Sequence, residues 1–407
     1  MNVLFLTLSN MEDINERGIY TDLVRELGNR GINMYVVSPR EKRVNLPTEL
    51  VVEGNINILK VKTGNITKTN FIEKGISTIS IERQYLNVIK KYFKDIRFDM
   101  VMYSTPPITF EKVVRYFKKK HESRTYLILK DIFPQNAVDI DIIKEGSLIW
   151  RYFRNKEKRL YEISDLIGCM SRGNVDYILN HNAYLARSKV EIFPNSIKPI
   201  ERIHRKNKNT AILNKYNIPS KATLFIYGGN LGKPQGIDFL LEVAGNFNKV
   251  DNGYLLIVGS GTEYKRIRNY IDDLKLKNVS LFNKIPKNEY DQLLEIADVG
   301  LIFLDKRFTI PNFPSRLTAY MEHSIPVLAA TDTNTDLKDV INESQCGLWL
   351  ESCDTISFIQ NANRLSADIT LRNKMGLNGR KYLEDNYDIR KTVDIIINHL
   401  DKEISNV

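Results

Sequence analysis

The sequence predicts an α/β protein made of two doubly wound domains in tandem. Short apolar runs alternate with amphipathic helical stretches along most of the chain, which implies βαβ units around parallel sheets. The alternation starts again after Asn195, and 407 residues are too many for one ordinary domain.

The first half of the chain holds apolar runs typical of buried strands at residues 3–9, 34–39, 56–62, 100–106, 125–132 and 166–171. Helical periodicity lies between them. The clearest case is YTDLVRELGNRG, residues 20–31, whose amphipathic pattern stops at Gly31. We therefore assign residues 1–197 to the first domain.

The second half repeats the pattern, with strand-like runs at residues 223–229, 253–261, 279–283, 299–304 and 326–331. Helical stretches cover residues 236–247, 264–274 and 289–297. The polar, lysine-rich segment 197–222 is the best candidate for a linker, and we assign residues 198–385 to the second domain. Residues 371–400 read as helix, and we expect residues 386–407 to return to the first domain.

The composition fits a soluble globular protein, with 43% hydrophobic and 27% charged residues and no apolar stretch of the ~20 residues that a spanning helix needs. The N-terminus reads as a buried strand and not as a signal peptide. Three cysteines without metal-like spacing favour a reducing cytoplasm. The formal net charge of +10 suggests a polyanionic partner, or reflects only a lysine-rich composition; both interpretations stay open.

Two strand-to-helix junctions of the second half carry anion-binding features, and open α/β sheets bind ligands beyond the carboxyl ends of their strands. In the first, a strand ends at Gly228, a loop holds Lys233, and a helix starts near Gly236. Glycines, helix N–H groups and a lysine together favour a phosphate, although for this loop alone a glycine turn with a surface lysine is the better explanation. In the second, Gly259 and Gly261 follow a strand, which is weak evidence alone.

A third junction lies in FTIPNFPSRLTAYMEHSIPVLAAT, residues 308–331. Pro311 and Pro314 stiffen the loop, and Ser315 is a candidate helix cap. Arg316 lies in the first helical turn, where the helix dipole favours an acid, so it makes sense if it shares an anion with free N–H groups. The alternative is an arginine facing solvent. Three such junctions on one sheet predict one diphosphate ligand.

Five segments carry a family resemblance: FPNSI (193–197), GNLGKPQGID (229–238), IVGSG (257–261), NKIPKNEYDQLLEIADVGL (283–301) and FPSRLTAYMEHSIPVLA (313–329). With them the chain resembles, over nearly its whole length, the GT-B glycosyltransferases of family 4. The subgroup it resembles most is the WbuB-like transferases of capsule and O-antigen assembly, which are linked to N-acetyl-L-fucosamine. The resemblance implies two Rossmann-like domains facing a cleft, the first binding the acceptor and the second the nucleotide sugar.

The resemblance also implies a reaction: retaining, metal-independent transfer from a UDP-sugar to a saccharide linked to polyprenyl diphosphate, with no cofactor beyond the donor. Lys233 and Arg316 would stabilise the leaving diphosphate, and Asp131 would steady the acceptor or the reacting sugar. Lys130 stands where relatives often have a histidine. The donor-binding residues that the resemblance implies are Gly229, Asn230, Lys233, Gln235, Gly259, Lys284, Ile285, Pro286, Tyr290, Pro314, Ser315, Arg316 and Glu322.

The sequence departs from the family pattern where relatives carry a Glu-x7-Glu motif. Pro311 and Ala319 occupy the two glutamate positions, the second of which usually binds the ribose. Glu322 lies one helical turn later, and whether it compensates stays open. The loop from Asn10 to Gly18 lacks the double glycine of relatives. These gaps fit a different ribose contact, an altered donor or an inactive homologue; we favour the first because the phosphate-side residues are intact.

Two basic-aromatic segments, residues 113–124 and 149–163, raise the question of a membrane. A helix bearing Trp150, Arg151 and Arg154 could lie on anionic lipid, or it could be a packed helix with a solvated basic face. We group these three residues with Lys130 as acceptor or membrane contacts. The acceptor class leads us to expect peripheral contact at the inner face of the cell membrane.

Two other functions compete with this interpretation. A GT-B-fold UDP-sugar epimerase would need carboxylates and histidines in the cleft, and no histidine falls on an identifiable strand end. A basic nucleic-acid-binding protein would need clustered charge or a recognisable binding signature, and neither is present. We therefore expect no nucleic-acid partner.

Overall fold

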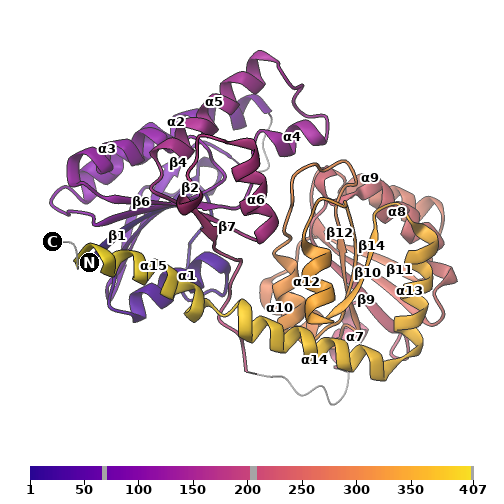
Figure 1. Ribbon diagram of the computed structural model, residues 1–407. Coiled ribbons are helices and arrows are strands. Elements are labelled where there is room, and N and C mark those ends of the chain that lie inside the picture. The colour runs from indigo at the N-terminus through magenta and orange to yellow at the C-terminus, as the bar shows by residue number, and fades with distance from the viewer. Residues whose placement is uncertain (67–70, 202–208, 405–407) are drawn as a thin grey trace. The chain divides into compact units, whose positions relative to one another are not determined.

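The computed structural model describes residues 1–66, 71–201 and 209–404 (Figure 1). The chain divides into two compact units, one formed by Met1–Lys198 with Asp388–Val407 and the other by Pro199–Tyr387. Residues 202–208 of the expected linker lie outside the described residues. We describe each unit by itself.

Unit 1 is built on an eight-stranded sheet in the order β3-β4-β2-β1-β5-β6-β7-β8. All neighbouring strands are parallel except β3 and β4. The strands are β1 (Asn2–Leu6), β2 (Asn33–Glu41), β3 (Glu49–Glu53), β4 (Ile56–Thr63), β5 (Met100–Ser104), β6 (Arg124–Leu129), β7 (Leu166–Cys169) and β8 (Val190–Ile192). The helices are α1 (Ile19–Asn29), α2 (Phe71–Tyr92), α3 (Glu111–His121), α4 (Gln135–Asp139), α5 (Leu148–Ile163), α6 (Arg172–His181) and α15 (Ile389–Ile404).

The C-terminal helix α15 completes one face of unit 1. Its Val393, Ile396 and Leu400 are fully buried in the same hydrophobic cluster as Leu23 and Leu27 of α1. The two helices lie side by side in Figure 1. A face of the first sheet is therefore covered by a segment that follows the whole of unit 2 in sequence.

Unit 2 has a six-stranded, wholly parallel sheet in the order β11-β10-β9-β12-β13-β14. The strands are β9 (Thr223–Asn230), β10 (Gly253–Ser260), β11 (Val279–Phe282), β12 (Val299–Phe303), β13 (Val327–Thr331) and β14 (Gly347–Glu351). The helices are α7 (Thr210–Lys215), α8 (Ile237–Asn246), α9 (Tyr264–Asp273), α10 (Lys287–Ile296), α11 (Arg316–Glu322), α12 (Leu337–Ser344), α13 (Thr355–Ala367) and α14 (Ile369–Asn386).

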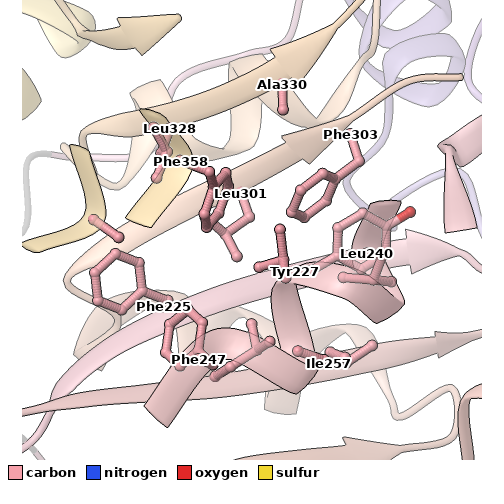
Figure 2. Close-up of a cluster of buried hydrophobic side chains, with 14 of the residues drawn as sticks. Phe225, Tyr227, Leu240, Phe247, Ile257, Leu301, Phe303, Leu328, Ala330 and Phe358 are labelled. Carbon is pink, nitrogen blue, oxygen red and sulfur yellow. The ribbon is translucent and has the colours of Figure 1, made fainter. Parts of the chain in front are cut away.

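The core of unit 2 is aromatic. Alternate residues of β9 and β12 face α8 and α13, because successive strand side chains point to opposite faces of the sheet. Figure 2 shows these rings gathered together. Phe303 stacks on Phe358 with 5.6 Å between ring centroids, and Phe225 meets Phe247 edge to face. This packing fixes the ends of β9 and β12, from which the candidate site is built.

The expected helical stretch 371–400 is two helices. The break falls between Asn386 and Ile389, where Asp388 forms a parallel bridge with Ile197. Helix α14 therefore belongs to unit 2 and α15 to unit 1. In the described part of the chain, no helix is both long enough and apolar enough to cross a membrane.

Candidate active site

The carboxyl ends of β9 and β10 meet closely in unit 2. Gly259 stands opposite Gly229 in the ladder, and a Cβ on Gly259 would lie only 2.0 Å from the carbonyl oxygen of Gly229. Gly229 itself has φ of 134°, which L side chains rarely adopt. A Cβ on Gly261 would lie 2.2 Å from the carbonyl oxygen of Leu231. The glycines of both junctions thus allow two backbones to approach at one sheet edge.

The loop that follows β9 joins the loop that follows β12. The backbone N–H of Asp305 donates to the carbonyl of Pro234 at 3.1 Å, and a Cβ on Gly236 would lie 2.9 Å from the carbonyl oxygen of Leu304. Strand order explains this contact, since β9 and β12 are neighbours in the sheet.

The proline-bearing loop before α11 is packed into unit 2. Phe308, Ile310 and Phe313 are buried. From the next strand-to-helix loop, the Asn334 side chain donates to the Phe308 carbonyl and the Thr335 hydroxyl to the Asn312 carbonyl, both at 2.6 Å. The loop is held in place by burial and hydrogen bonds, and it delivers Arg316 to the edge of the sheet.

The side chain of Arg316 is held by contacts with two residues of unit 2. Its guanidinium lies over the ring of Tyr227, 4.3 Å from the centroid, and its Nη2 donates to Oε1 of Gln235 at 2.7 Å. The Tyr227 hydroxyl donates to the carbonyl of Asn230 at 2.7 Å. Nη1 of Arg316 is buried and has no hydrogen-bond partner among the residues described. A buried guanidinium N–H without a partner is costly, so this atom is a candidate contact for an anionic ligand.

The expected cap at Ser315 is wrong. Ser315 is already in the right-handed helical conformation, with φ of −64° and ψ of −17°, and its side chain makes no capping hydrogen bond. A capping side chain reaches the free N–H groups only from a non-helical backbone. The Ser315 carbonyl instead accepts a hydrogen bond from the Thr318 hydroxyl at 2.8 Å.

Two further tyrosines lie beneath this edge. A Cβ on Gly228 would meet the Tyr290 hydroxyl at 1.9 Å, so the phenol rests directly on that glycine. The Tyr320 hydroxyl contacts the carbonyls of Ile226 and Leu301, each at 3.1 Å. Burial raises the pKa of Tyr320 to about 12 and that of Tyr290 well above its ordinary value. Both phenols stay neutral, so Arg316 remains the charge of this cluster.

The other expected donor residues differ in exposure. Gly229, Asn230 and Lys233 are exposed. In the loop before α10, Lys284 and Pro286 are exposed and Ile285 is half-buried, as is Pro314 before α11. The contacts found in unit 2 join Gly229, Asn230, Gln235, Gly259 and Tyr290 to the surroundings of Arg316. Pro286 is joined to this cluster through its carbonyl, which accepts the backbone N–H of Tyr290 at 3.0 Å.

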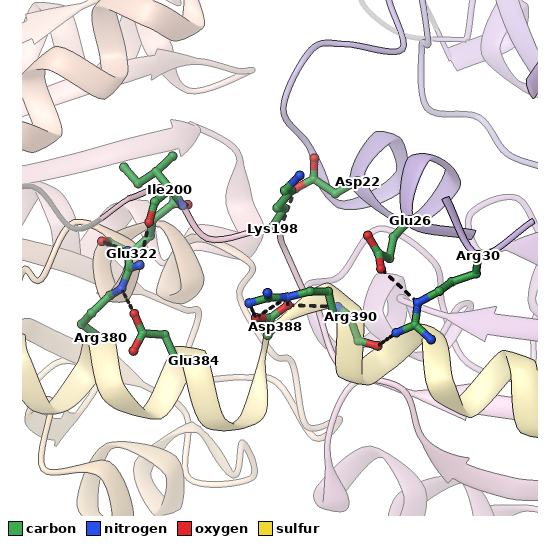
Figure 3. A network of polar contacts seen from close by, with 10 residues as sticks. All are labelled: Asp22, Glu26, Arg30, Lys198, Ile200, Glu322, Arg380, Glu384, Asp388 and Arg390. Atoms are coloured by element: carbon green, nitrogen blue, oxygen red, sulfur yellow. Dashed lines mark hydrogen bonds and ion pairs between the residues drawn. The ribbon is translucent and has the colours of Figure 1, made fainter. Parts of the chain in front are cut away.

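Glu322 is engaged elsewhere (Figure 3). It is buried at the end of α11, and its Oε1 accepts the backbone N–H of Ile200 at 3.0 Å. The carboxylate thus holds the backbone of Ile200, and the place of Glu322 among the donor-binding residues stays a prediction.

In unit 1, the candidate residues follow β6. The backbone N–H groups of Lys130 and Asp131 both donate to the Thr105 hydroxyl, at 3.0 and 3.3 Å. Burial raises the pKa of Asp131 to about 6. Burial also raises the pKa of the neighbouring Tyr20, with a smaller contribution from the Asp131 charge. Asp131 is thus a carboxyl group whose protonation changes near neutral pH, as at many catalytic sites.

The amine of Lys130 is buried. Its Nζ lies 5.7 Å from the centroid of the Phe193 ring and has no hydrogen-bond partner among the described residues. Burial lowers its pKa to about 7. A buried amine cannot contact lipid, so the membrane part of its grouping is wrong.

Side chains hold the first loop of unit 1, between Asn10 and Gly18. Lys60 donates to the Glu12 carbonyl at 2.6 Å, and Arg25 donates to the carbonyls of Ile14 and Glu16. Three carbonyls of the loop are thus fixed by two cations, where relatives were expected to use a double glycine.

The basic-aromatic helices are mostly packed. Arg154 pairs with Glu157 and donates to Asn182, which removes it from the lipid-contact group, and Lys118 of α3 pairs with Asp165. Trp150 is half-buried and Arg151 is exposed. Large apolar side chains are exposed instead at and before the start of α5: Ile142 (55%), Leu148 (83%), Ile149 (60%) and Tyr152 (43%).

Sequence reasoning missed Tyr227 and Tyr320. Both fall in segments that read as ordinary buried core, and Tyr227 does belong to the core cluster of unit 2. Their roles depend on the position of the ring relative to Arg316, for which the sequence has no signal. No group of three or more His, Cys, Asp or Glu side chains is placed to bind a metal within residues 1–66, 71–201 and 209–404.

Comparison with solved structures defines the fold class. Sucrose-phosphate synthase from Thermosynechococcus elongatus superposes with a TM-score of 0.75 at 15% identity, covering 100% of both chains. WaaG, a glycosyltransferase involved in lipopolysaccharide biosynthesis, gives 0.66 at 13% identity over 97% of this chain and 99% of its own. HepE of Anabaena, in complex with UDP and glucose, gives 0.68 at 12% identity over 99% and 100%. The chain has the GT-B fold.

Sequence comparison points the same way. Residues 208–382 match the family model "Glycosyl transferases group 1". The "Probable glycosyltransferase WbjE" of Pseudomonas aeruginosa is 21% identical over 346 residues, 84% of this chain and 83% of that protein. The "Putative colanic acid biosynthesis glycosyl transferase WcaI" of Escherichia coli (strain K12) is 26% identical over 227 residues, 54% of each.

Proposed function

We propose that the protein is a retaining glycosyltransferase. It transfers a sugar from a UDP-sugar to a saccharide linked to polyprenyl diphosphate, in capsule or O-antigen polysaccharide synthesis. The donor sugar that the WbuB-like resemblance favours is an N-acetylated deoxyhexosamine. The observation that carries the proposal is the position of Arg316 at the carboxyl edge of the sheet, where its buried Nη1 has no acceptor among the described residues. The HepE complex with UDP supports the donor class, and the name of WcaI, a putative colanic acid biosynthesis glycosyl transferase, supports the polysaccharide class.

The proposed chemistry needs positioning and charge stabilisation. The bond between the sugar C1 and the β-phosphate oxygen breaks, and the acceptor oxygen bonds to C1 on the same face. The acceptor proton passes to the departing diphosphate. Arg316 and the exposed Lys233 stabilise the negative charge that develops there, an effect worth about 3 kcal/mol per well-placed donor. Asp131, whose pKa is about 6, steadies the acceptor hydroxyl or the positive charge at C1.

We propose that no metal takes part, because two side-chain cations supply the charge that a metal would supply. Turnover should be unchanged after treatment with EDTA. Adding Mg²⁺ or Mn²⁺ afterwards should not raise it. A large loss with EDTA that Mg²⁺ reverses would contradict this part of the proposal.

The central experiment measures UDP release with a polyprenyl-diphosphate-linked acceptor in Lys233→Ala and Arg316→Ala. Both variants should lose turnover. Lys381→Ala is the control, since this exposed lysine of α14 only pairs with Asp385. Near wild-type turnover in both variants would remove the diphosphate assignment.

A thermal-shift panel of UDP, GDP and TDP tests which nucleotide the protein binds. We expect UDP to raise the melting temperature most.

The proposal includes peripheral contact with anionic membrane, at the start of α5. Ile142, Leu148, Ile149 and Tyr152 are exposed there, with the exposed Lys144 and Arg151 among them. Exposed apolar side chains that alternate with cations suit the surface of an anionic bilayer.

Sedimentation with anionic liposomes at low and high salt tests this contact. A Leu148→Glu/Ile149→Glu double variant should bind less than the wild type at both salt concentrations. Ile356→Glu is the matched control, because Ile356 is 74% exposed on α13. Equal sedimentation of all three proteins would contradict the contact.

The epimerase alternative gains no support. The described histidines lie in helices or at helix ends: His121, His181, His323 and His399. None follows a strand at a carboxyl edge, where acid–base chemistry would need it.

A further inference from the structure

The two ends of helix α11 make different contacts. It spans seven residues, so its first and last Cα atoms are about 9 Å apart along the axis. Arg316 is its first residue and faces Gly229, whose Cβ would lie 3.2 Å from Arg316 Nη2. Glu322 is its last residue and holds Ile200. So short a helix has little stability of its own. Its position depends on its buried face, with Leu317, Tyr320 and Met321, and on the contacts at its ends.

Both backbone groups of Ile200 are bound by side chains of unit 2 (Figure 3). Its N–H donates to Glu322 Oε1 at 3.0 Å, and its carbonyl accepts Nη2 of Arg380 at 2.6 Å. The Nη1 of the same arginine donates to the carbonyl of Glu322 at 2.9 Å. Arg380 is buried, and its Nε donates to Glu384 at 2.6 Å. We call Ile200, Glu322 and Arg380 the Ile200 clamp.

The clamp rests on a close contact between helices. A Cβ on Gly376 of α14 would lie 2.0 Å from the carbonyl oxygen of Ser324, just after α11, and one on Gly379 would lie 3.4 Å from Met321. Helix α14 therefore presses against the end of α11, and Arg380 projects from that contact. Because the two helices are in such close contact, we expect a change at the clamp to shift α11.

From this arrangement we propose that Glu322 and Arg380 are positioning residues for Arg316. They fix the C-terminal end of α11 to the backbone of Ile200 and so hold the guanidinium at the other end in register with Gly229. This rests on the proposed function, since it is the β-phosphate that Arg316 would bind. It also gives Glu322 a role in the reaction without any contact with the donor.

The experiment compares UMP with UDP, because the ratio of their dissociation constants isolates the contribution of the β-phosphate. Titration calorimetry on the full chain gives this ratio for the wild type, Arg316→Ala, Glu322→Met and Glu322→Gln. Glu322→Met removes the acceptor for the Ile200 N–H, and the ratio should fall about fivefold while the UMP constant stays within twofold. Glu322→Gln keeps an oxygen acceptor and should restore the ratio. Asp385→Asn is the matched control, because this exposed carboxylate of α14 pairs with Lys381, and it should leave the ratio unchanged.

If Glu322→Met does not fold, Arg380→Lys replaces it, since a lysine keeps the charge but cannot bridge two carbonyls in the same way. A fall in the ratio with Arg316→Ala but not with a folded clamp variant overturns the clamp and leaves the proposed function standing. An equal loss of UMP and UDP in the clamp variant also overturns it, because that is general distortion. No fall with Arg316→Ala overturns the proposed function and this inference with it.

Discussion

The carboxyl edges of the two sheets are built in opposite ways. In unit 2, Gly259 lets the ends of β9 and β10 approach. The Arg316 guanidinium lies over the Tyr227 ring and donates a hydrogen bond to the side-chain oxygen of Gln235. In unit 1, side chains such as Lys60 hold the loop carbonyls, while burial raises the pKa of Asp131 to about 6 and lowers that of Lys130 to about 7. The first edge is arranged around a permanent charge, and the second keeps two groups that titrate near neutral pH.

The difference indicates a division of labour. An arginine stays charged at every working pH, which suits a constant anion such as a diphosphate. A carboxyl group whose pKa is about 6 changes its charge with small changes in surroundings, which suits a group that meets a developing charge. Each of the following changes tests one side of this contrast.

The largest expected effect is a loss of folding stability in unit 2. Gly259→Ala places a methyl group 2.0 Å from a backbone oxygen, and we expect a loss of about 3 kcal/mol in the free energy of unfolding. The counterpart in unit 1, Gly18→Ala, has an extended backbone with φ of 178° and meets only a side-chain oxygen at 3.2 Å. It should cost less than about 0.5 kcal/mol. Urea denaturation measures both, and similar losses would show that the edges do not differ in this way.

Asp131→Asn should lower kcat about a hundredfold and yet raise the melting temperature at pH 7.5. The folded pKa of about 6 lies above the ordinary value of 3.8, so the ionised carboxyl is disfavoured in the folded protein. That penalty is complete above pH 6 and disappears as pH falls toward 4, and the gain in melting temperature should shrink over the same range.

The kinetic part of this prediction separates catalysis from stability. Calorimetry at pH 7.5 and 4.5 gives the melting temperatures, and initial rates give kcat. A variant that is stabilised but fully active would limit Asp131 to a structural role.

Tyr227→Leu removes the ring beneath Arg316 and should raise the KM for the nucleotide sugar about tenfold, the size expected for a partly desolvated cation–π contact. Tyr227→Phe keeps the ring and loses the hydrogen bond to the Asn230 carbonyl and the longer one to Gln235 Oε1, so its KM should stay within about threefold. Steady-state rates with varied donor measure both. Equal effects of the two variants would assign the role to the hydroxyl and not to the ring.

The smallest expected effect is that of Lys130→Met, a gain of about 3 °C in melting temperature at pH 6.5. Its folded pKa is lowered to about 7 from 10.5, so the buried charge destabilises the folded protein fully below pH 7. The penalty falls as pH rises through 7 toward 10.5, and the gain should be nearly absent at pH 10. Lys119→Met, at an exposed position of α3, should give no gain at either pH, and a gain at pH 6.5 that persists at pH 10 would indicate better packing instead.

Local patterns predicted the alternating fold and the glycine junctions, because strand burial and turn chemistry depend on neighbouring residues. Features set by distant residues were not predictable. The periodicity of residues 371–400 is unbroken, and its division into two helices depends on the pairing of Asp388 with Ile197. Similarly, the role of Glu322 depends on Ile200, 122 residues earlier in the chain.

Two misinterpretations had different origins. That Ser315 is not a cap follows from a backbone dihedral that no residue type dictates. Arg154, however, pairs with Glu157 three residues later, and this helical spacing was visible in the sequence.

The place of α15 in unit 1 has a consequence for biosynthesis. During translation, the first 198 residues leave the ribosome long before Val393, Ile396 and Leu400, which they need to cover Leu23 and Leu27. Until about 190 further residues have been made, that apolar surface has no permanent cover. Unit 1 therefore stays incomplete until α15 has been made and released, and a nascent chain stalled within unit 2 should depend on chaperones more than the released protein does.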